Sequence, residues 1–145
     1  MTAKVHISDG RSGTGNRACV TNIGQVVTGA FSYDLTQFME LAEDDTAYNF
    51  YGPKAGEQFV ITGIVAKADK QVSATVDAVV IVYEADESTD TTATRVLLEM
   101  AMVEGDLAII TPMNVLVNSG KFINGKTTDD DIHMTIMGYY VPIVE

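Results

Sequence analysis

Several residue types that build catalytic and metal sites are scarce in this chain. It has no tryptophan, one cysteine (Cys19) and two histidines, His6 and His133. A single cysteine excludes an intramolecular disulfide, which fits assembly in a reducing cytoplasm. Neither histidine has a cysteine, histidine or acidic neighbour at metal-ligand spacing, so no zinc site is predicted. No motif such as G-x-S-x-G supports a nucleophile, so we expect neither an enzyme nor a bound cofactor.

Positive charge is also scarce, and it is unevenly placed. The chain has 9 Lys and Arg against 20 Asp and Glu, a net charge of −11. Residues 1–33 carry three cations and one acid, or +2, which leaves −13 for residues 34–145. An acidic surface of this kind repels phosphates, so nucleic acid is not expected as a partner.

Long apolar runs are missing too. No stretch approaches the roughly 20 residues that cross a bilayer, and the N-terminus lacks the apolar segment of a signal peptide. We therefore expect a soluble protein without an N-terminal export signal and without a membrane partner. Hydrophobic residues make up 46% of the 145 residues, which suits one folded domain. The interpretation is a glycine-rich N-terminal arm over 1–33, which we call the leader, and a β-sandwich domain over 34–145.

The body consists mainly of short apolar segments separated by turn-forming residues. This pattern predicts an all-β, antiparallel sandwich rather than βαβ units. One exception precedes them: Leu35, Phe38, Met39 and Ala42 follow a helical spacing, with Asp34 as N-cap, which predicts one short helix. The predicted strands are Gln58–Ala68, Asp77–Tyr83, Arg95–Met102, Leu107–Ile110, Val115–Val117 and Ile132–Val141.

Two predicted strand segments, 59–65 and 78–83, are apolar on both faces, so something must cover the second face. A neighbouring subunit is the favoured cover, which makes a homo-oligomer the expectation. Loops of the same chain are the alternative. The candidate subunit-interface residues are Phe59, Ile61, Val65, Val80 and Val82.

The leader half-matches a phosphate-binding loop, because Gly10 and Gly15 are four residues apart. The match fails where Asn16-Arg17 stands in place of the required Lys and Ser or Thr, so no nucleotide site is predicted. Arg11 and Arg17 flank the glycines, and such a loop can follow a partner surface and bind its carboxylates. A non-specific terminus is the equally weighted alternative.

Acidic and aromatic clusters allow two interpretations each. The run Asp129–Asp131, with Asp44–Asp45 or with Asp86, Glu87 and Asp90, offers oxygen ligands for Ca²⁺ but lacks EF-hand spacing, so solvated loops are favoured.

The aromatic residues around Gly52-Pro53 either seal an edge of the core or anchor an interface. They are Tyr48, Phe50, Tyr51 and Phe59.

The leader carries the one sharp motif. The stretch from Asp9 to Val20, DGRSGTGNRACV, followed by a β-rich body that ends on GKFINGK (120–126) and GYYVP (138–142), resembles small virion proteins of tailed bacteriophages. In those proteins a D-G-x-G-x-G-N-R-A-like leader precedes a jelly-roll-like domain. Here Arg11-Ser12 stands between Gly10 and Gly13, a departure from that pattern.

The resemblance implies a capsid decoration, or cement, protein. Such a protein is a homotrimeric sandwich, made in the bacterial cytoplasm, that binds the major capsid protein on the outer surface of the phage head. The capsid-anchoring residues it implies are Asp9, Gly10, Arg11, Gly13, Gly15, Asn16 and Arg17. The alternative function is a tail or fibre receptor-binding module for a host-surface glycan, for which the candidate residues are Tyr48, Tyr51, Tyr139 and Tyr140.

Overall fold

The computed structural model describes residues 35–42, 44–69, 72, 74–129 and 131–143. The leader and its seven predicted anchoring residues lie outside these ranges, as does the suggested N-cap Asp34. Within them the protein is all β, with nine strands and no helix. The strands are β1 (Leu35–Leu41), β2 (Tyr48–Tyr51), β3 (Glu57–Ala68), β4 (Ala78–Ala85), β5 (Arg95–Met102), β6 (Leu107–Ile110), β7 (Val115–Leu116), β8 (Phe122–Thr127) and β9 (Ile132–Pro142).

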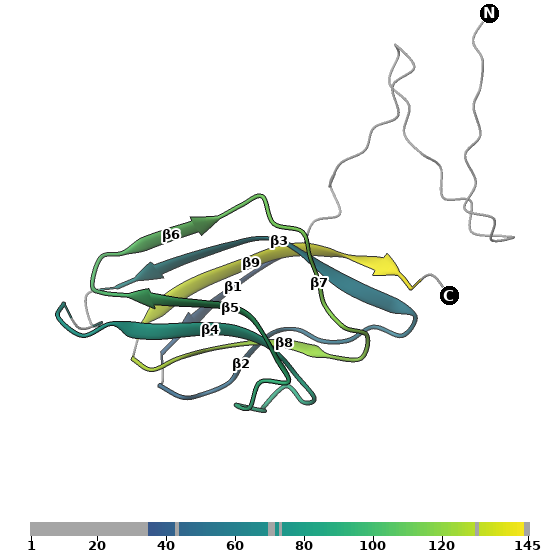
Figure 1. The fold of residues 1–145 in the computed structure, drawn as a ribbon, viewed down its shortest axis with the longest axis horizontal. Helices are drawn as coiled ribbons and strands as arrows, with labels where there is room; N and C mark the ends of the chain where they lie inside the picture. The colour runs from purple at the N-terminus through teal and green to yellow at the C-terminus, as the bar shows by residue number, and fades with distance from the viewer. Residues whose placement is uncertain (1–34, 43, 70–71, 73, 130, 144–145) are drawn as a thin grey trace, which may run out of the picture. The chain divides into compact units, whose positions relative to one another are not determined.

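The strands form two antiparallel sheets, which confirms the predicted all-β sandwich. One sheet has the order β1-β9-β3-β6, with β7 also paired to β3, and the other has the order β2-β8-β4-β5. Figure 1 shows the two layers, with β6, β3 and β9 in one and β4, β8 and β2 in the other. Consecutive strands lie in opposite sheets, except for the pair β4 and β5 and the pair β6 and β7.

The core lies between the sheets and is built by strand alternation. Every second side chain of a strand points to the same face, so an alternating apolar pattern buries one side. Along β3 and β9 these inward positions are almost fully buried. The members of the core cluster from the four central strands include Ile61, Ile64, Ala66, Val80, Val82, Ile123, Met134 and Ile136.

The helix predicted around residues 34–42 is wrong. Residues 35–41 form β1, which pairs with β9 in unbroken register from Leu35 opposite Gly138 to Leu41 opposite Ile132. The alternating positions Met39 and Leu41 face the core, whereas Phe38 lies on the opposite face. Because the exposed Phe38 is adjacent to the inward-facing Met39, the apolar residues of this strand happen to follow a helical spacing. Pairing with β9 determines the conformation, since tertiary contacts outweigh a weak local preference.

Besides β1, two strands were not predicted, β2 and β8. The Asn124-Gly125 pair in β8 is a common turn signal, yet both residues pair with β2 and β4. Gly125 is needed for packing, because a Cβ there would lie 2.9 Å from Cε2 of Phe50. The close approach of an aromatic ring explains why glycine interrupts this strand pattern.

The structure shows that most of the subunit-interface candidates are core residues, so the argument that a second subunit must cover them is wrong. Phe59, Ile61, Val80 and Val82 are buried in the core of the single chain. The opposite sheet of the same chain covers them, so their apolar character requires no second subunit. Val65 alone is half-buried, and it faces away from this core.

Candidate functional site

An aromatic cluster lies at one end of the sandwich, where β2, β3 and β9 meet. The rings of Tyr51 and Phe59 stack with centroids 4.2 Å apart, and Tyr140 meets Phe59 edge-on at 4.9 Å. Tyr51 and Phe59 are buried, and Tyr140 is half-buried. Aromatic pairs in these geometries add to the stability gained from area burial alone. The open choice between core edge and interface is thus settled for Tyr51 and Phe59 as a core edge.

Hydroxyl groups of this cluster connect the two sheets. Tyr51 on β2 donates to the Ile136 carbonyl on β9 at 2.7 Å, and Tyr140 on β9 donates to the Gly52 carbonyl after β2 at 2.6 Å. Burial, and then the neighbouring Tyr140, raise the pKa of Tyr51 to about 12. Burial, and then Glu57, raise the pKa of Tyr140. Both phenols are therefore neutral hydrogen-bond donors at ordinary pH.

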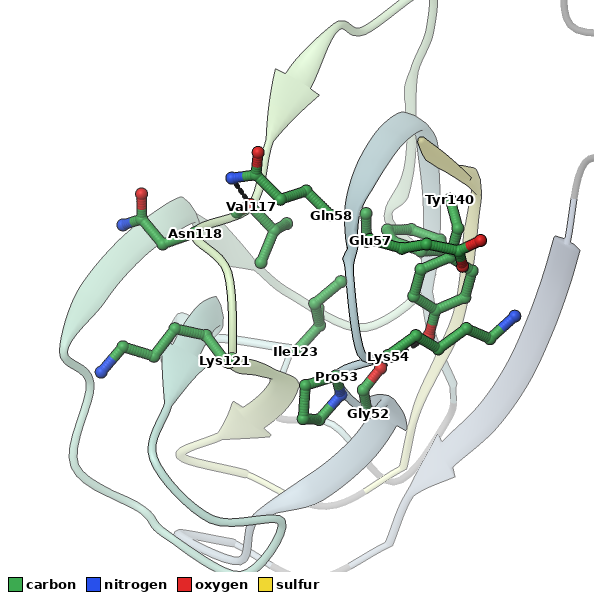
Figure 2. Close-up of a pocket in the computed structure, with 12 residues that line it drawn as sticks. Gly52, Pro53, Lys54, Glu57, Gln58, Val117, Asn118, Lys121, Ile123 and Tyr140 are labelled. Carbon is green, nitrogen blue, oxygen red and sulfur yellow. Dashed lines mark hydrogen bonds between the residues drawn. The ribbon is translucent and has the colours of Figure 1, made fainter. Parts of the chain in front are cut away.

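A small pocket opens beside this cluster (Figure 2). Its cavity volume is about 10 Å³, roughly the space of one water molecule and far below that of a small-molecule site. The Lys54 amino group lies 3.9 Å from the Tyr140 ring centroid, and Lys121 pairs with Asp86. Figure 2 shows these two amino groups pointing outward on opposite sides of the pocket. The side-chain amide of Gln58, another lining residue, donates to the Val117 carbonyl at 3.1 Å and is therefore already hydrogen-bonded within the protein.

The tyrosines proposed for glycan binding do not form one site. Tyr139 and Tyr140 are consecutive on β9 and therefore point to opposite faces of the sheet. The Tyr48 hydroxyl accepts the Ala42 N–H at 3.1 Å, and the Tyr51 hydroxyl is buried in its bond to Ile136. A glycan-binding surface would need these rings to converge at the surface, and they do not.

A buried carboxylate, Glu84, is the polar centre that sequence reasoning missed. It is fully buried in β4 and pairs with Arg95 at the start of β5. Asn118 supplies two further bonds, from its backbone N–H at 2.8 Å and its side-chain amide at 2.9 Å. Arg95 also donates to the Leu116 carbonyl at 2.7 Å. The carboxylate is thus fully paired, and it fastens β4 and β5 to the chain after β7 as a structural ion pair.

The acidic runs form turns in the described part of the chain. Asp45 and Asp131 have positive φ angles of 49° and 59°, a conformation that aspartate tolerates better than most residues. Asp90 accepts the Glu87 N–H at 3.1 Å, closing a local turn. No group of three or more His, Cys, Asp or Glu side chains suited to a metal ion occurs among the residues described.

The outer face of the sheet β1-β9-β3-β6 carries a row of four paired side chains, three of which are apolar. Ile109 on β6 pairs with Val65, Val65 with Thr135, and Thr135 with Phe38 on β1, so the four side chains share one face. Phe38 is 58% and Ile109 62% exposed. We call Ile109, Val65, Thr135 and Phe38 the outer apolar row.

A second row runs beside it in the same register. Leu107, Lys67, His133 and Glu40 are paired across the four strands. The ring of His133 meets Phe38 edge-on at 5.9 Å, and its Nε2 lies 3.9 Å from Oε1 of Glu40. His133 is half-exposed, as its alternation on the strand predicted. Together the two rows are the candidate functional surface, because they bring the exposed apolar residues Phe38, Ile109 and Leu107 onto one outer face.

Comparison with known proteins identifies no relative, since no family model, curated protein or solved structure matches this chain. Within the described residues no helix is long and apolar enough to span a membrane. The chain is therefore defined by its own features: a two-sheet β-sandwich with an exposed apolar row on one outer face.

Proposed function

We propose that this protein is a non-enzymatic capsid decoration, or cement, protein that binds the outer surface of a phage head as a homotrimer. The observation that carries the proposal is the outer apolar row on a sandwich whose sequence is strongly acidic. Such a row suits attachment and assembly. The leader motif, which resembles that of phage virion proteins, supplies the partner: the major capsid protein.

The strand order supports the same proposal. A jelly roll consists of two sheets in eight strands, connected as two Greek keys. The orders β1-β9-β3-β6 and β2-β8-β4-β5 support this topology when β7 is taken as a short extension of β6, because consecutive strands then lie in opposite sheets except for β4 and β5. We interpret the sandwich as this fold, which is the one that the leader resemblance implies.

In this role the protein acts by bridging. Each leader, through Asp9 to Arg17, binds across a junction between shell subunits, and the glycines let its backbone follow the shell surface. Binding to the assembled shell and not to its separated subunits stabilises the shell by mass action. Three leaders on one trimer bind with an avidity that exceeds the affinity of one leader.

The proposal predicts that the leader cations are required for decoration. The full chain carrying Arg11→Ala and Arg17→Ala, and a chain lacking residues 1–17, should remain oligomeric but lose co-sedimentation with undecorated phage heads. The matched control is Lys54→Ala, which removes a cation from the body and should leave binding unchanged.

Retained binding by both leader variants would contradict the anchoring role. A wild-type protein that ignores heads but binds host cells would instead favour the receptor-binding module.

A further inference from the structure

We infer that a second copy of this chain covers the outer apolar row, with Phe38 of one copy opposite Ile109 of the next. The inference rests on the oligomer of the proposed function and names its interface. Of the five interface candidates chosen from the sequence, only Val65 belongs to this row.

The apolar groups lie at both edges of the sheet. Phe38 is on β1 and Ile109 is on β6, the two outermost strands in the sheet order. Leu107, also on β6, is 60% exposed. Scattered single apolar residues are normal on a protein surface, but here Val65 and Thr135 on the two central strands join Phe38 to Ile109 in one paired row. Each copy thus offers an aromatic group at one edge and branched aliphatic groups at the other.

The charge of this face favours a copy of the same chain as its occupant. Residues 34–145 carry a charge of −13, so two copies repel each other over most orientations. In the two rows the acidic residue Glu40 is balanced by the basic residue Lys67. Two acidic molecules can therefore approach each other here without facing like charges.

Symmetry brings the complementary groups together. The three-fold axis of a homotrimer, placed parallel to the strands, keeps every residue at its height along the strands. It sets β6 of one copy beside β1 of the next, so the in-register residues Ile109 and Phe38 meet at one level. Lys67 lies on β3, one strand spacing of about 4.8 Å in from β6, so its long side chain can extend towards the neighbouring copy's Glu40.

The test measures the mass of the full chain in solution by light scattering. Phe38→Lys and Ile109→Glu should each weaken association at least tenfold, because each buries an unpaired charge in the interface. The double variant should associate more tightly than either single variant, since the new charges are opposite and face each other. The matched control is Val76→Lys, because Val76 is 67% exposed in the connection between β3 and β4.

Three results would overturn the interface. They are a monomeric wild type, single variants that associate as the wild type does while keeping its circular dichroism spectrum, and a double variant no tighter than the singles.

Head binding separates this inference from the proposed function. An oligomer that dissociates in the single variants but ignores phage heads supports the interface and refutes decoration. An oligomer that binds heads but is insensitive to both substitutions overturns the interface and leaves decoration standing.

Discussion

At the scale of single residues, the buried polar groups hold distant segments together. In the described part of the chain every buried side-chain nitrogen and oxygen has a hydrogen-bond partner. Asn124 on β8 donates to the carbonyls of Glu87 and Asp90 and accepts from Asn49 at 2.9 Å. An unpaired polar group at such a site costs about 1–3 kcal/mol, so these side chains specify the loop between β4 and β5 as well as the strands.

The raised pKa of Tyr51 predicts a loss of stability in alkali. Its folded-state pKa of about 12 exceeds the unfolded value of 10.0, so its contribution is complete below pH 10 and is lost as pH rises towards 12. A two-unit shift corresponds to roughly 2–3 kcal/mol. Urea unfolding from pH 9 to 12 should show this decline, and Tyr51→Phe should flatten part of it. A variant that declines as steeply as the wild type would contradict the assignment.

The burial and pairing of Glu84 could not be predicted from the sequence around it. The sequence places Glu84 after an apolar run and Arg95 eleven positions later, which is an ordinary arrangement of surface charges. Their pairing depends on the β4–β5 register, and Asn118 joins them only because the chain crosses from β7 in one sheet to β8 in the other. Long-range topology, not local pattern, buries this carboxylate.

At the scale of elements, the sequence predicts strands best where alternation is long and apolar. Most predicted strand bounds lie close to the observed ones, as for β5 and β6, where they coincide. The misses, β1, β2 and β8, are strands in which a polar or glycine residue sits inward or an aromatic residue sits outward. In each case a partner strand decides the conformation, because strand preference depends on context.

The contact between β9 and β3 predicts a strict requirement for Gly138. A Cβ there would lie 2.1 Å from the Val60 carbonyl oxygen and 2.5 Å from the Phe59 ring. Gly138→Ala should therefore destabilise the protein by about 1–3 kcal/mol or more, since backbone cannot yield as a side chain does. Gly52→Ala is the matched control, because its nearest neighbour would be 3.5 Å away. Chemical denaturation measures both, and equal, small effects would contradict the close approach.

At the scale of the whole molecule, excess negative charge opposes the compact state. The net charge is −11, and salt screens the repulsion because the Debye length falls from about 30 Å at 0.01 M to about 3 Å at 1 M. We predict that the free energy of unfolding at pH 7 rises on the order of 1 kcal/mol over this range. Thermal unfolding in NaCl series checks it, with sucrose as the uncharged control. A fall in stability with salt would show that the paired charges outweigh the repulsion.

The candidate surface could be foreseen only in part. Apolar character on both faces of the segment 59–65 indicated an uncovered face, and Val65 lies on it. Phe38 and Ile109 were out of reach because they join Val65 only through pairings between strands far apart in the sequence. The leader's role rests on its motif alone, because residues 1–34 lie outside the described ranges.

The central position of β9 has a consequence for synthesis. β9 separates β1 from β3 in the sheet and pairs with both, yet it follows every other described strand in the sequence. Leu35 and its partner Gly138 are about a hundred positions apart, a separation typical of slow folding. As the chain leaves the ribosome, the segments of β1 and β3 therefore emerge before β9, the strand that pairs with both. Until it emerges, their unpaired edges need protection from pairing with other nascent chains.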